Sequence, residues 1–299
     1  MAVRTLTLNP SIDVSSDTGK VEPTRKVRTC NERIDPGGGG INVARVLHRF
    51  GTSVEALYLA GGATGGSLDV LLERVGLARR CVPIADDTRT SLTIHEHSTG
   101  LEYRFVPEGP TITKAELEEC CKAVAAAECD YFVASGSLPP GVPDDFYAIV
   151  SEPVRERGAR FVLDTSGAEL DAAIAVGGIH LVKASGEELE PAGAEDIVRS
   201  GRAELVAITL GRDGAELITP TGRFALPAVR TEVVSTVGAG DSFLAGMTYG
   251  LATGLEPIAA FRIAVAAGAA ATLSPGTDLC YPDDVERLLA HVPDPEPLR

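Results

Sequence analysis

Short, almost uninterrupted apolar runs alternate with helical patterns along the whole 299-residue chain. Val, Ile, Leu and Ala fill these runs without inside–outside alternation, as is typical of strands that are buried on both faces of a parallel sheet. The pattern predicts an α/β fold, with a mostly parallel central sheet covered by helices on both faces and joined by right-handed crossovers. The expected strands are Thr5–Leu8, Val54–Leu59, Tyr131–Ser135, Phe161–Asp164, Leu181–Lys183 and Leu205–Leu210.

Helical segments with recognisable ends lie between these runs. The segment Ile41–Phe50 places its apolar residues on one face and ends before Gly51, a residue suited to a helix C-terminus. Asp241–Ala252 ends near Gly254, and Pro257–Leu273 is rich in alanine. Because alanine side chains are small, we expect this last helix to pack very closely against a neighbour.

Two stretches interrupt the α/β pattern. Val14–Pro36 is polar and mostly basic, and Arg89–Val106 alternates in polarity around a turn at Ser98–Gly100, which is typical of a hairpin. We expect them, at about residues 14–36 and 88–107, to form a small β-sheet lid inserted into one domain that spans residues 1–299. A sheet of two or three strands is marginal alone, so we expect it to pair with a second copy in a homodimer.

Composition narrows the range of partners and of cellular compartments. The net charge of -15, from 27 basic and 42 acidic side chains, argues against nucleic acid and membrane surfaces as partners. The six cysteines form no C-x-x-C pair or zinc pattern, which indicates reduced thiols. No apolar run is long enough for a signal peptide or a membrane span, so we expect a cytoplasmic protein. The Pro-rich tail Pro293–Arg299 is expected to be frayed.

Two glycine-rich segments lead directly into predicted helices. Gly37–Gly40 precedes Asn42, and Thr236–Gly240 precedes Asp241. Backbone N–H groups at such helix starts bind anionic oxygens, and a carboxylate at Asp241 can accept the proton of a hydroxyl that attacks phosphorus. Alone, the first segment fits a flexible loop equally well, and aspartate in a first turn is also favoured by the helix dipole.

Two weaker signals follow other predicted strands, where ligands bind in open α/β sheets. The turn Thr209–Ala215 is flanked by glycines and is suited to nucleotide phosphates. In Lys183–Glu188, the lysine can reach a phosphate and Glu188 can order water that is bound to magnesium. Alone, each signal also fits an ordinary turn or a solvated helix start.

Together these segments carry the motifs of a known enzyme family over essentially the whole chain. The motifs are N-P-S-I-D at 9–13, G-G-G-G-I-N-V-A-R at 37–45, G-G-A-T-G at 61–65, S-G-S-L-P-P-G at 135–141, T-L-G-R-D-G-A at 209–215 and S-T-V-G-A-G-D-S at 235–242. In order and spacing they resemble the ribokinase-like (PfkB) family of carbohydrate kinases. Gly39 stands where fructose-1-phosphate and tagatose-6-phosphate kinases of the family usually carry lysine, so the sequence is most similar to the 6-phosphofructokinase branch.

The resemblance implies a ribokinase-like fold and ATP-dependent phosphorylation of a sugar phosphate, foremost fructose 6-phosphate to fructose 1,6-bisphosphate. It implies a catalytic base at Asp241, with an anion hole made by Gly238, Ala239 and Gly240. It implies ATP contacts at Lys183, Thr209, Gly211, Gly214, Gly240 and Gly268. It implies sugar contacts at Asp13, Gly38, Gly39 and Asn42, and contacts with the existing phosphate at Lys26, Arg28, Arg89, Arg104 and Ser137. The basic bias of residues 20–33 favours a phosphorylated sugar over a neutral one.

One departure from the family pattern concerns the metal. The family usually has Asn-x-x-Glu after the lysine, whereas this chain has Ser185 and retains Glu188. The implied cofactor is Mg²⁺, held by these two residues through water, and K⁺ is a further implied ion.

Alternatives remain open at this point. They are a tagatose-6-phosphate or fructose-1-phosphate kinase, and a sugar-phosphate-binding regulator without turnover, which the retained Asp241 and glycines disfavour. An NAD-dependent enzyme is disfavoured because no G-x-G-x-x-G follows the first strand.

Overall fold

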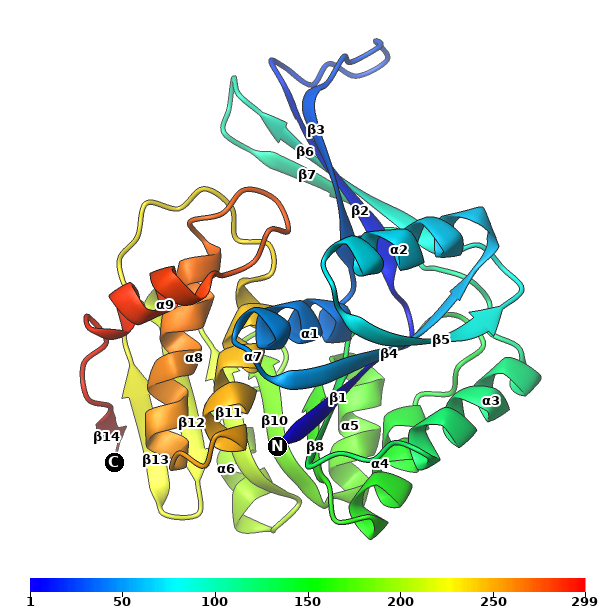
Figure 1. Ribbon diagram of the computed structural model, residues 1–299. Helices are drawn as coiled ribbons and strands as arrows, with labels where there is room; N and C mark the ends of the chain where they lie inside the picture. Colours follow the sequence, from blue (N-terminus) through cyan, green and yellow to red (C-terminus); the bar gives the residue numbers. More distant parts are fainter. Residues whose placement is uncertain (299) are drawn as a thin grey trace.

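The computed structural model describes residues 1–298 and contains a ten-stranded sheet and a separate four-stranded sheet (Figure 1). The large sheet has the order β14-β13-β12-β11-β10-β9-β8-β1-β4-β5. Neighbouring strands from β5 to β11 run parallel, and β12 to β14 complete one edge in antiparallel fashion. The strands are β1 Ala2–Thr7, β4 Ser53–Gly61, β5 Ala78–Ile84, β8 Tyr131–Ser135, β9 Arg160–Asp164, β10 Ile179–Ser185, β11 Ala203–Thr209, β12 Ala215–Thr219, β13 Gly222–Leu226 and β14 Glu296–Leu298.

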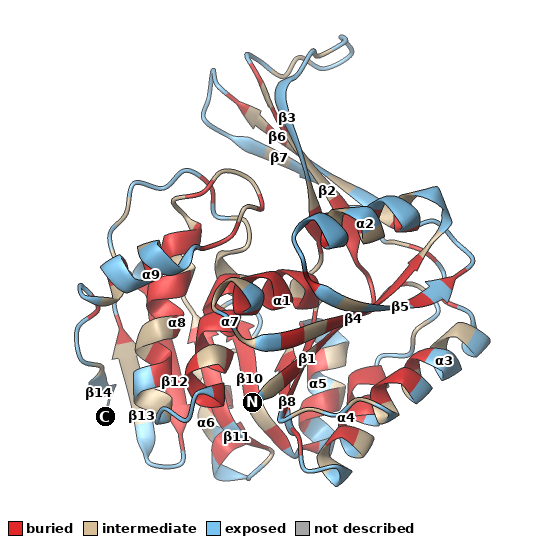
Figure 2. Cartoon of the chain, viewed as in Figure 1, coloured by how far each residue is buried: buried red, intermediate tan, exposed pale blue. Residues whose placement is uncertain are grey.

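Helices cover both faces of this sheet, and the core is split into two layers (Figure 2). Along β8, Val133 packs into one layer while Phe132 and Ala134 pack into the other, as the period of a strand requires. One layer contains α1 Gly39–Arg49, α2 Gly62–Arg74, α7 Ala239–Ala252, α8 Pro257–Ala271 and α9 Pro282–Leu289; the other contains α3 Lys114–Ala125, α4 Phe146–Glu156, α5 Gly167–Val176 and α6 Pro191–Arg199. The predicted α/β fold, its six strands and its three helices are confirmed, with ends that differ by a few residues.

The close packing expected of the alanine-rich helix is also confirmed. Helix α8 lies against α7, where a Cβ atom added to Gly250 would stand 2.6 Å from the Cα atom of Ala260. A Cβ atom on Gly246 would likewise meet Ala267 at 2.9 Å. Only glycine at these two positions lets the helices approach so closely along the middle and the end of α7.

The second sheet projects from the main body (Figure 1). Its strands are β2 Ser11–Thr18, β3 Cys30–Gly37, β6 Arg89–Glu96 and β7 Glu102–Phe105, in the order β3-β2-β6-β7. Strands β6 and β7 form the predicted hairpin, and β2 pairs with β6 in parallel. We call this four-stranded sheet the lid. The sequence predicted two or three strands, so the lid has one strand more than expected.

The two faces of the lid differ in polarity. Val14 lies opposite Ile34 on β3 and Leu92 on β6, and Leu92 lies opposite Phe105 on β7. These four side chains form an apolar row across the lid, in which Ile34 is 50% and Phe105 is 59% exposed. The opposite face, which carries Asp13 among other polar residues, is turned toward the main body.

The expectation of a frayed tail is wrong for Glu296–Leu298. Glu296–Leu298 forms β14, which pairs with β13 at the sheet edge, with Pro297 opposite Phe224. An edge strand offers unpaired backbone groups, and the tail satisfies them. Residue 299 lies outside the described residues. Within 1–298, none of the helices combines the length and the apolar character that crossing a bilayer would require.

Candidate active site

A cleft of about 320 Å³ lies between the polar face of the lid and the carboxyl ends of β8 and β9. In the sheet, β1 stands between β4 and β8. The chain first adds β4 and β5 on one side of β1 and later adds β8 and β9 on the other side. Ligands of open α/β sheets bind at such a switch point. The predicted residues that line the cleft are Asp13, Gly38, Gly39, Asn42, Arg89, Arg104, Ser137, Glu188, Gly238 and Asp241.

Two helices begin at this cleft. Helix α1 follows Gly38, whose φ of 110° is unsuited to other residues, and α7 follows Gly238, whose φ is 74°. Near these starts, Asn42 Nδ2 donates a hydrogen bond of 2.8 Å to Asp241 Oδ2. The glycine-rich segments therefore bring two positive helix ends and one carboxylate together, an arrangement suited to a phosphoryl group and a base.

The environment of Asp241 raises its pKa to about 6 from the ordinary value of 3.8. Burial is the main cause, and the negative charge of Asp164 adds to it. The hydrogen bond from Asn42 and the charge of Lys183 act in the opposite direction. A carboxylate with a pKa near 6 is ionised at neutral pH and is still a stronger base than an exposed aspartate, as general base catalysis requires.

Lys183 lies beside the loop that is predicted to form the anion hole. Its Nζ atom stands 3.0 Å from Asp164 Oδ1, and a Cβ atom added to Gly240 would stand 3.1 Å from that nitrogen. Burial lowers the pKa of Lys183, but the charges of Asp164 and Asp241 outweigh it, so the pKa is raised and the ammonium group is charged. The cation is thus placed beside the backbone N–H groups predicted to hold the transferring phosphoryl group.

Sequence reasoning missed Asp164, which also accepts a hydrogen bond of 3.2 Å from Ser135 Oγ. Both residues line the cleft, each at the carboxyl end of its strand. The signal was present, because Phe161–Asp164 is a predicted strand and its last residue is polar. The rule that drew attention to Lys183 and Thr209 applies equally to Asp164.

The glycine segment packs against neighbouring side chains on the side of the cleft where sugar contacts are predicted. A Cβ atom on Gly39 would stand 2.3 Å from Ser135 Oγ, so no other residue fits there unless Ser135 moves. Ser11 Oγ donates a hydrogen bond of 2.5 Å to Asp13 Oδ1, and burial raises the pKa of Asp13. These contacts orient Asp13 toward the cleft.

The predicted phosphate-binding cations are not all in one place. Arg104 is exposed on the lid and lines the cleft. Arg89 also lines it, but its Nη1 and Nη2 atoms donate to the backbone oxygens of Pro107 at 2.9 Å and Asn9 at 2.8 Å, which fixes the base of the lid.

Lys26 and Arg28 lie outside the cleft. They are exposed in the loop between β2 and β3, and they do not line the cleft of their own chain. The two strands carry this loop to the far end of the lid (Figure 1). The phosphate contacts of Lys26 and Arg28 therefore stay a prediction.

The residues predicted to contact ATP lie along the adjoining strand ends. Ser185 and Thr209 are neighbours across β10 and β11, and Glu188 accepts a 2.7 Å hydrogen bond from the Ser185 backbone N–H group. Gly211 opens a short 3₁₀ helix, Gly211–Asp213, and Gly214 ends it with a φ of 108°. Gly268 lies in α8, where a Cβ atom would stand 3.3 Å from the backbone oxygen of Ala239, so it serves helix packing at the anion hole.

The acidic residues of the site fit a metal that arrives with the nucleotide. Within residues 1–298, no group of three or more His, Cys, Asp or Glu side chains is arranged to hold a metal ion. The carboxylates of Glu188 and Asp164 line the cleft. Magnesium is usually held by one or two carboxylates, water and substrate phosphates, and this donor set matches that pattern.

Comparison with known proteins identifies the class. The family model described as pfkB family carbohydrate kinase matches residues 7–284, so the chain belongs to the PfkB family of carbohydrate kinases. It is 43% identical to ATP-dependent 6-phosphofructokinase isozyme 2 of Mycobacterium tuberculosis (strain ATCC 25618 / H37Rv) over 97% of this chain and 90% of that protein. It is 33% identical to the 1-phosphofructokinase of Xanthomonas campestris over 88% of each.

Solved structures agree with this assignment. Phosphofructokinase-2 from Escherichia coli in complex with fructose-6-phosphate has a TM-score of 0.91 at 36% identity, over 97% of this chain and 98% of that one. The same enzyme in complex with potassium gives 0.92 at 37% identity over the same shares of the two chains, and its tetrameric inhibited form gives 0.90 at 36%. The predicted family and its ribokinase-like fold are confirmed.

Proposed function

We propose that this kinase transfers the terminal phosphoryl group of ATP to fructose 6-phosphate and forms fructose 1,6-bisphosphate. The observation that carries the proposal is the 2.8 Å contact between Asn42 and Asp241, made between two helix starts in a cleft beneath a polar lid face. The 43% identity to a 6-phosphofructokinase over nearly the full length supports this substrate above the 1-phosphofructokinase alternative, whose relative is 33% identical.

The proposed chemistry assigns one step to each part of the site. Asp241 takes the proton of the sugar C1 hydroxyl as that oxygen forms its bond to phosphorus, while the bond from phosphorus to the ADP oxygen breaks. Backbone N–H groups of Gly238, Ala239 and Gly240, with the ammonium group of Lys183, stabilise the charge on the transferring group. The remaining predicted ATP contacts are Thr209, Gly211, Gly214 and Gly268.

Binding of the sugar phosphate is assigned to the lid side of the cleft. Asp13 and Asn42 orient sugar hydroxyls, and Gly38 and Gly39 let the sugar approach the backbone. Arg104 and Ser137 contact the existing phosphate, with Arg89 adding positive charge. Glu188 and Ser185 would hold Mg²⁺ through water together with the nucleotide, and the ion would neutralise phosphate charge there. K⁺ is proposed as a further ion, since a potassium complex of the E. coli relative is known.

We also propose that the protein is a cytoplasmic homodimer and that each chain forms one kinase domain, residues 1–299 with the inserted lid. The exposed part of the apolar row, Ile34, Leu92 and Phe105, supports the assembly, because an exposed apolar face on a small sheet needs a covering surface. A second lid is complementary to it.

A coupled assay of ATP consumption over a panel of sugars tests the function. We expect kcat/KM for fructose 6-phosphate to exceed that for fructose at least about tenfold, because losing a charge-assisted contact costs about 1.5–3 kcal/mol. Tagatose 6-phosphate and fructose 1-phosphate serve as matched controls of equal charge. Equal rates with free sugars would exclude a phosphosugar kinase, and a preference for either control would replace the proposed substrate.

A further inference from the structure

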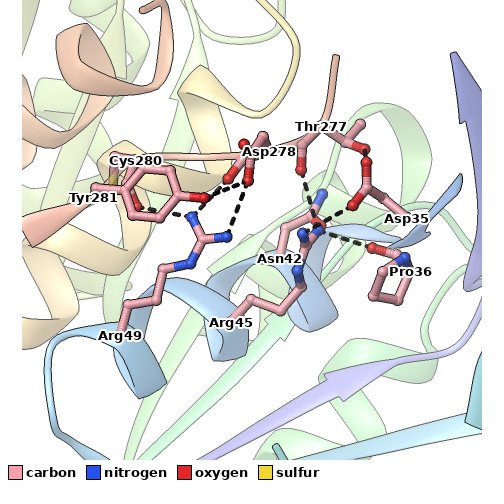
Figure 3. A network of polar contacts seen from close by, with 9 residues as sticks. All are labelled: Asp35, Pro36, Asn42, Arg45, Arg49, Thr277, Asp278, Cys280 and Tyr281. Carbon is pink, nitrogen blue, oxygen red and sulfur yellow. Dashed lines mark hydrogen bonds and ion pairs between the residues drawn. The ribbon is translucent and has the colours of Figure 1, made fainter. Parts of the chain in front are cut away.

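Arg45 is buried behind the catalytic cleft, one helical turn after Asn42 (Figure 3). Its side chain is only 3% exposed. Its Nη1 atom donates to Asn42 Oδ1 at 3.3 Å, to the backbone oxygen of Pro36 at 3.0 Å and to that of Thr277 at 3.2 Å. Its Nη2 atom stands 3.5 Å from Asp35 Oδ1. One guanidinium group therefore joins α1 to the end of lid strand β3 and to the loop after α8.

The contact with Arg45 settles which way the Asn42 amide is turned. A guanidinium group has donors only, so the Asn42 atom that faces it must be the oxygen. The amide nitrogen then faces Asp241 Oδ2, at 2.8 Å. Turning the amide over would set its NH₂ group against the guanidinium and its oxygen against the carboxylate, which replaces two attractive contacts with two repulsive ones.

The geometry of Arg45 is unlike that of a simple ion pair. Its carboxylate partner, Asp35, stands 3.5 Å away, at the outer limit of a hydrogen bond, and also accepts a 3.2 Å hydrogen bond from Thr277 Oγ1. The shorter contacts of Arg45 go to neutral oxygens on three separate segments. Burying a guanidinium group in this way is costly unless each contact is held in place, so the three segments are fixed relative to one another.

We propose that Arg45 is a positioning residue for catalysis, which acts through Asn42 to hold the amide nitrogen against the carboxylate of Asp241 and so fixes the direction of the base. The proposal rests on the proposed kinase function. It adds a residue that touches neither substrate but sets the geometry of the group that takes the proton.

A pH profile distinguishes this role from a structural one. The charged groups that face Asp241 are Asp164 from β9, Lys183 from β10 and Asp13 from the lid, and Asn42 faces it from α1. Of these four residues, Asn42 is the one to which Arg45 donates a hydrogen bond. The hydrogen bond from Asn42 lowers the pKa of Asp241, so its loss moves the acid limb of the kcat profile to higher pH.

The first test is Arg45→Lys, which keeps the positive charge near Asp35 but replaces the planar guanidinium group, with its several N–H donors, by a single ammonium nitrogen. We expect kcat to fall roughly tenfold, comparable to one hydrogen bond, with the acid limb shifted upward and both KM values changed less than about threefold. In an Asn42→Ala background the same change should have no further effect on kcat, because the contact through which it acts is gone.

Arg49→Lys is the matched control. Arg49 lies one turn further along α1 and donates to Asp278, through Nη1 to its backbone oxygen at 2.6 Å and through Nη2 to its carboxylate at 3.2 Å (Figure 3). We expect this variant to lose stability while kcat and the acid limb stay as in the unaltered enzyme. The proposal would be overturned if the losses of kcat caused by Arg45→Lys and Asn42→Ala simply add in the double variant. It would also be overturned if the acid limb of the kcat profile lies at the same pH in Arg45→Lys and Arg49→Lys.

A measurement on the unaltered protein covers the case in which Arg45→Lys fails to fold. The side-chain amide protons of Asn42, assigned by their loss in Asn42→Ala, should be resolved by NMR and should follow the titration of Asp241 near pH 6. Averaged signals from a rotating amide, or no response to pH, would overturn the proposal. If the unaltered protein lacks activity with fructose 6-phosphate, the proposed function fails. The NMR measurement still tests the contact between the Asn42 amide and Asp241.

Discussion

Replacing Asp241 with asparagine should stabilise the protein while removing its activity. The pKa of this carboxyl is about 6 in the folded chain against an ordinary 3.8, a rise of about two units. At about 1.4 kcal/mol per unit, burying the ionised form costs the fold about 3 kcal/mol. Asparagine carries no charge, and its side-chain oxygen can still accept the hydrogen bond from Asn42. The amide cannot take a proton, so we expect kcat to fall roughly 10²-fold or more while ATP binding persists.

The sign of the pH dependence follows from the raised pKa. The folded state holds the Asp241 proton more tightly than the unfolded chain does, so the cost is absent below about pH 3.8. It grows as pH rises toward about 6 and is constant above that pH. The gain in free energy of unfolding from Asp241→Asn should therefore be about 3 kcal/mol at pH 8 and only about 1 kcal/mol at pH 4.5.

Urea unfolding followed by circular dichroism at both pH values measures this gain. A matched control is Asp69→Asn, because hydrogen bonds from Arg79 and Tyr58 hold the pKa of Asp69 at about 2. Its substitution should destabilise the fold at neutral pH, which is the opposite sign. If Asp241→Asn is no more stable than the unaltered protein at pH 8, or gains equally at both pH values, the reasoning from burial is refuted.

Three further predictions concern the base, the lid and the metal. Below about pH 6 we expect kcat to fall as Asp241 is protonated, so a pH–rate profile that stays flat to pH 5 would remove it as the base. Phe105→Ser should dissociate the dimer in sedimentation at micromolar concentration. The control Val176→Ser, at a 61% exposed site on α5, should leave the dimer intact. An unaltered protein that is monomeric and fully active would contradict the lid interface. Ser185→Asn should lower the magnesium concentration for half-maximal rate, since apparent binding of magnesium should strengthen by about 1 kcal/mol, comparable to one hydrogen bond. An unchanged magnesium requirement would show that the serine has no effect on metal binding.

The parts of the fold that could be predicted depend on local signals. Buried runs such as Tyr131–Ser135 identify strands, and glycines before Asn42 and Asp241 identify helix starts, because both patterns lie within a few residues. Arg45 is the last residue of the motif at 37–45, but the motif does not show what its side chain contacts. The backbone oxygen of Thr277 that it binds lies 232 positions away, so its role emerges only when the chain is folded.

The same limit applies to the tail and to the loop at the end of the lid. The pairing of the tail with β13 depends on which strand forms the sheet edge, and the place of Lys26 and Arg28 depends on how far β2 and β3 project. Periodicity and composition carry neither fact. Asp164 is different, since its position at a strand end was visible and was passed over.

The charges of the cleft give a reason for the proposed Mg²⁺ that does not depend on any motif. Four carboxylates line it, those of Asp13, Asp164, Glu188 and Asp241, in a chain of net charge -15. Two of the available cations are already engaged, Lys183 by Asp164 and Arg89 by backbone oxygens. Because these contacts already offset part of their charge, further attraction for two phosphorylated substrates is expected from Arg104, from the helix starts of α1 and α7, and from cations that accompany the nucleotide. Because Glu188 is held by the Ser185 N–H group at 2.7 Å, its negative charge stays at the cleft, where such a cation would be needed.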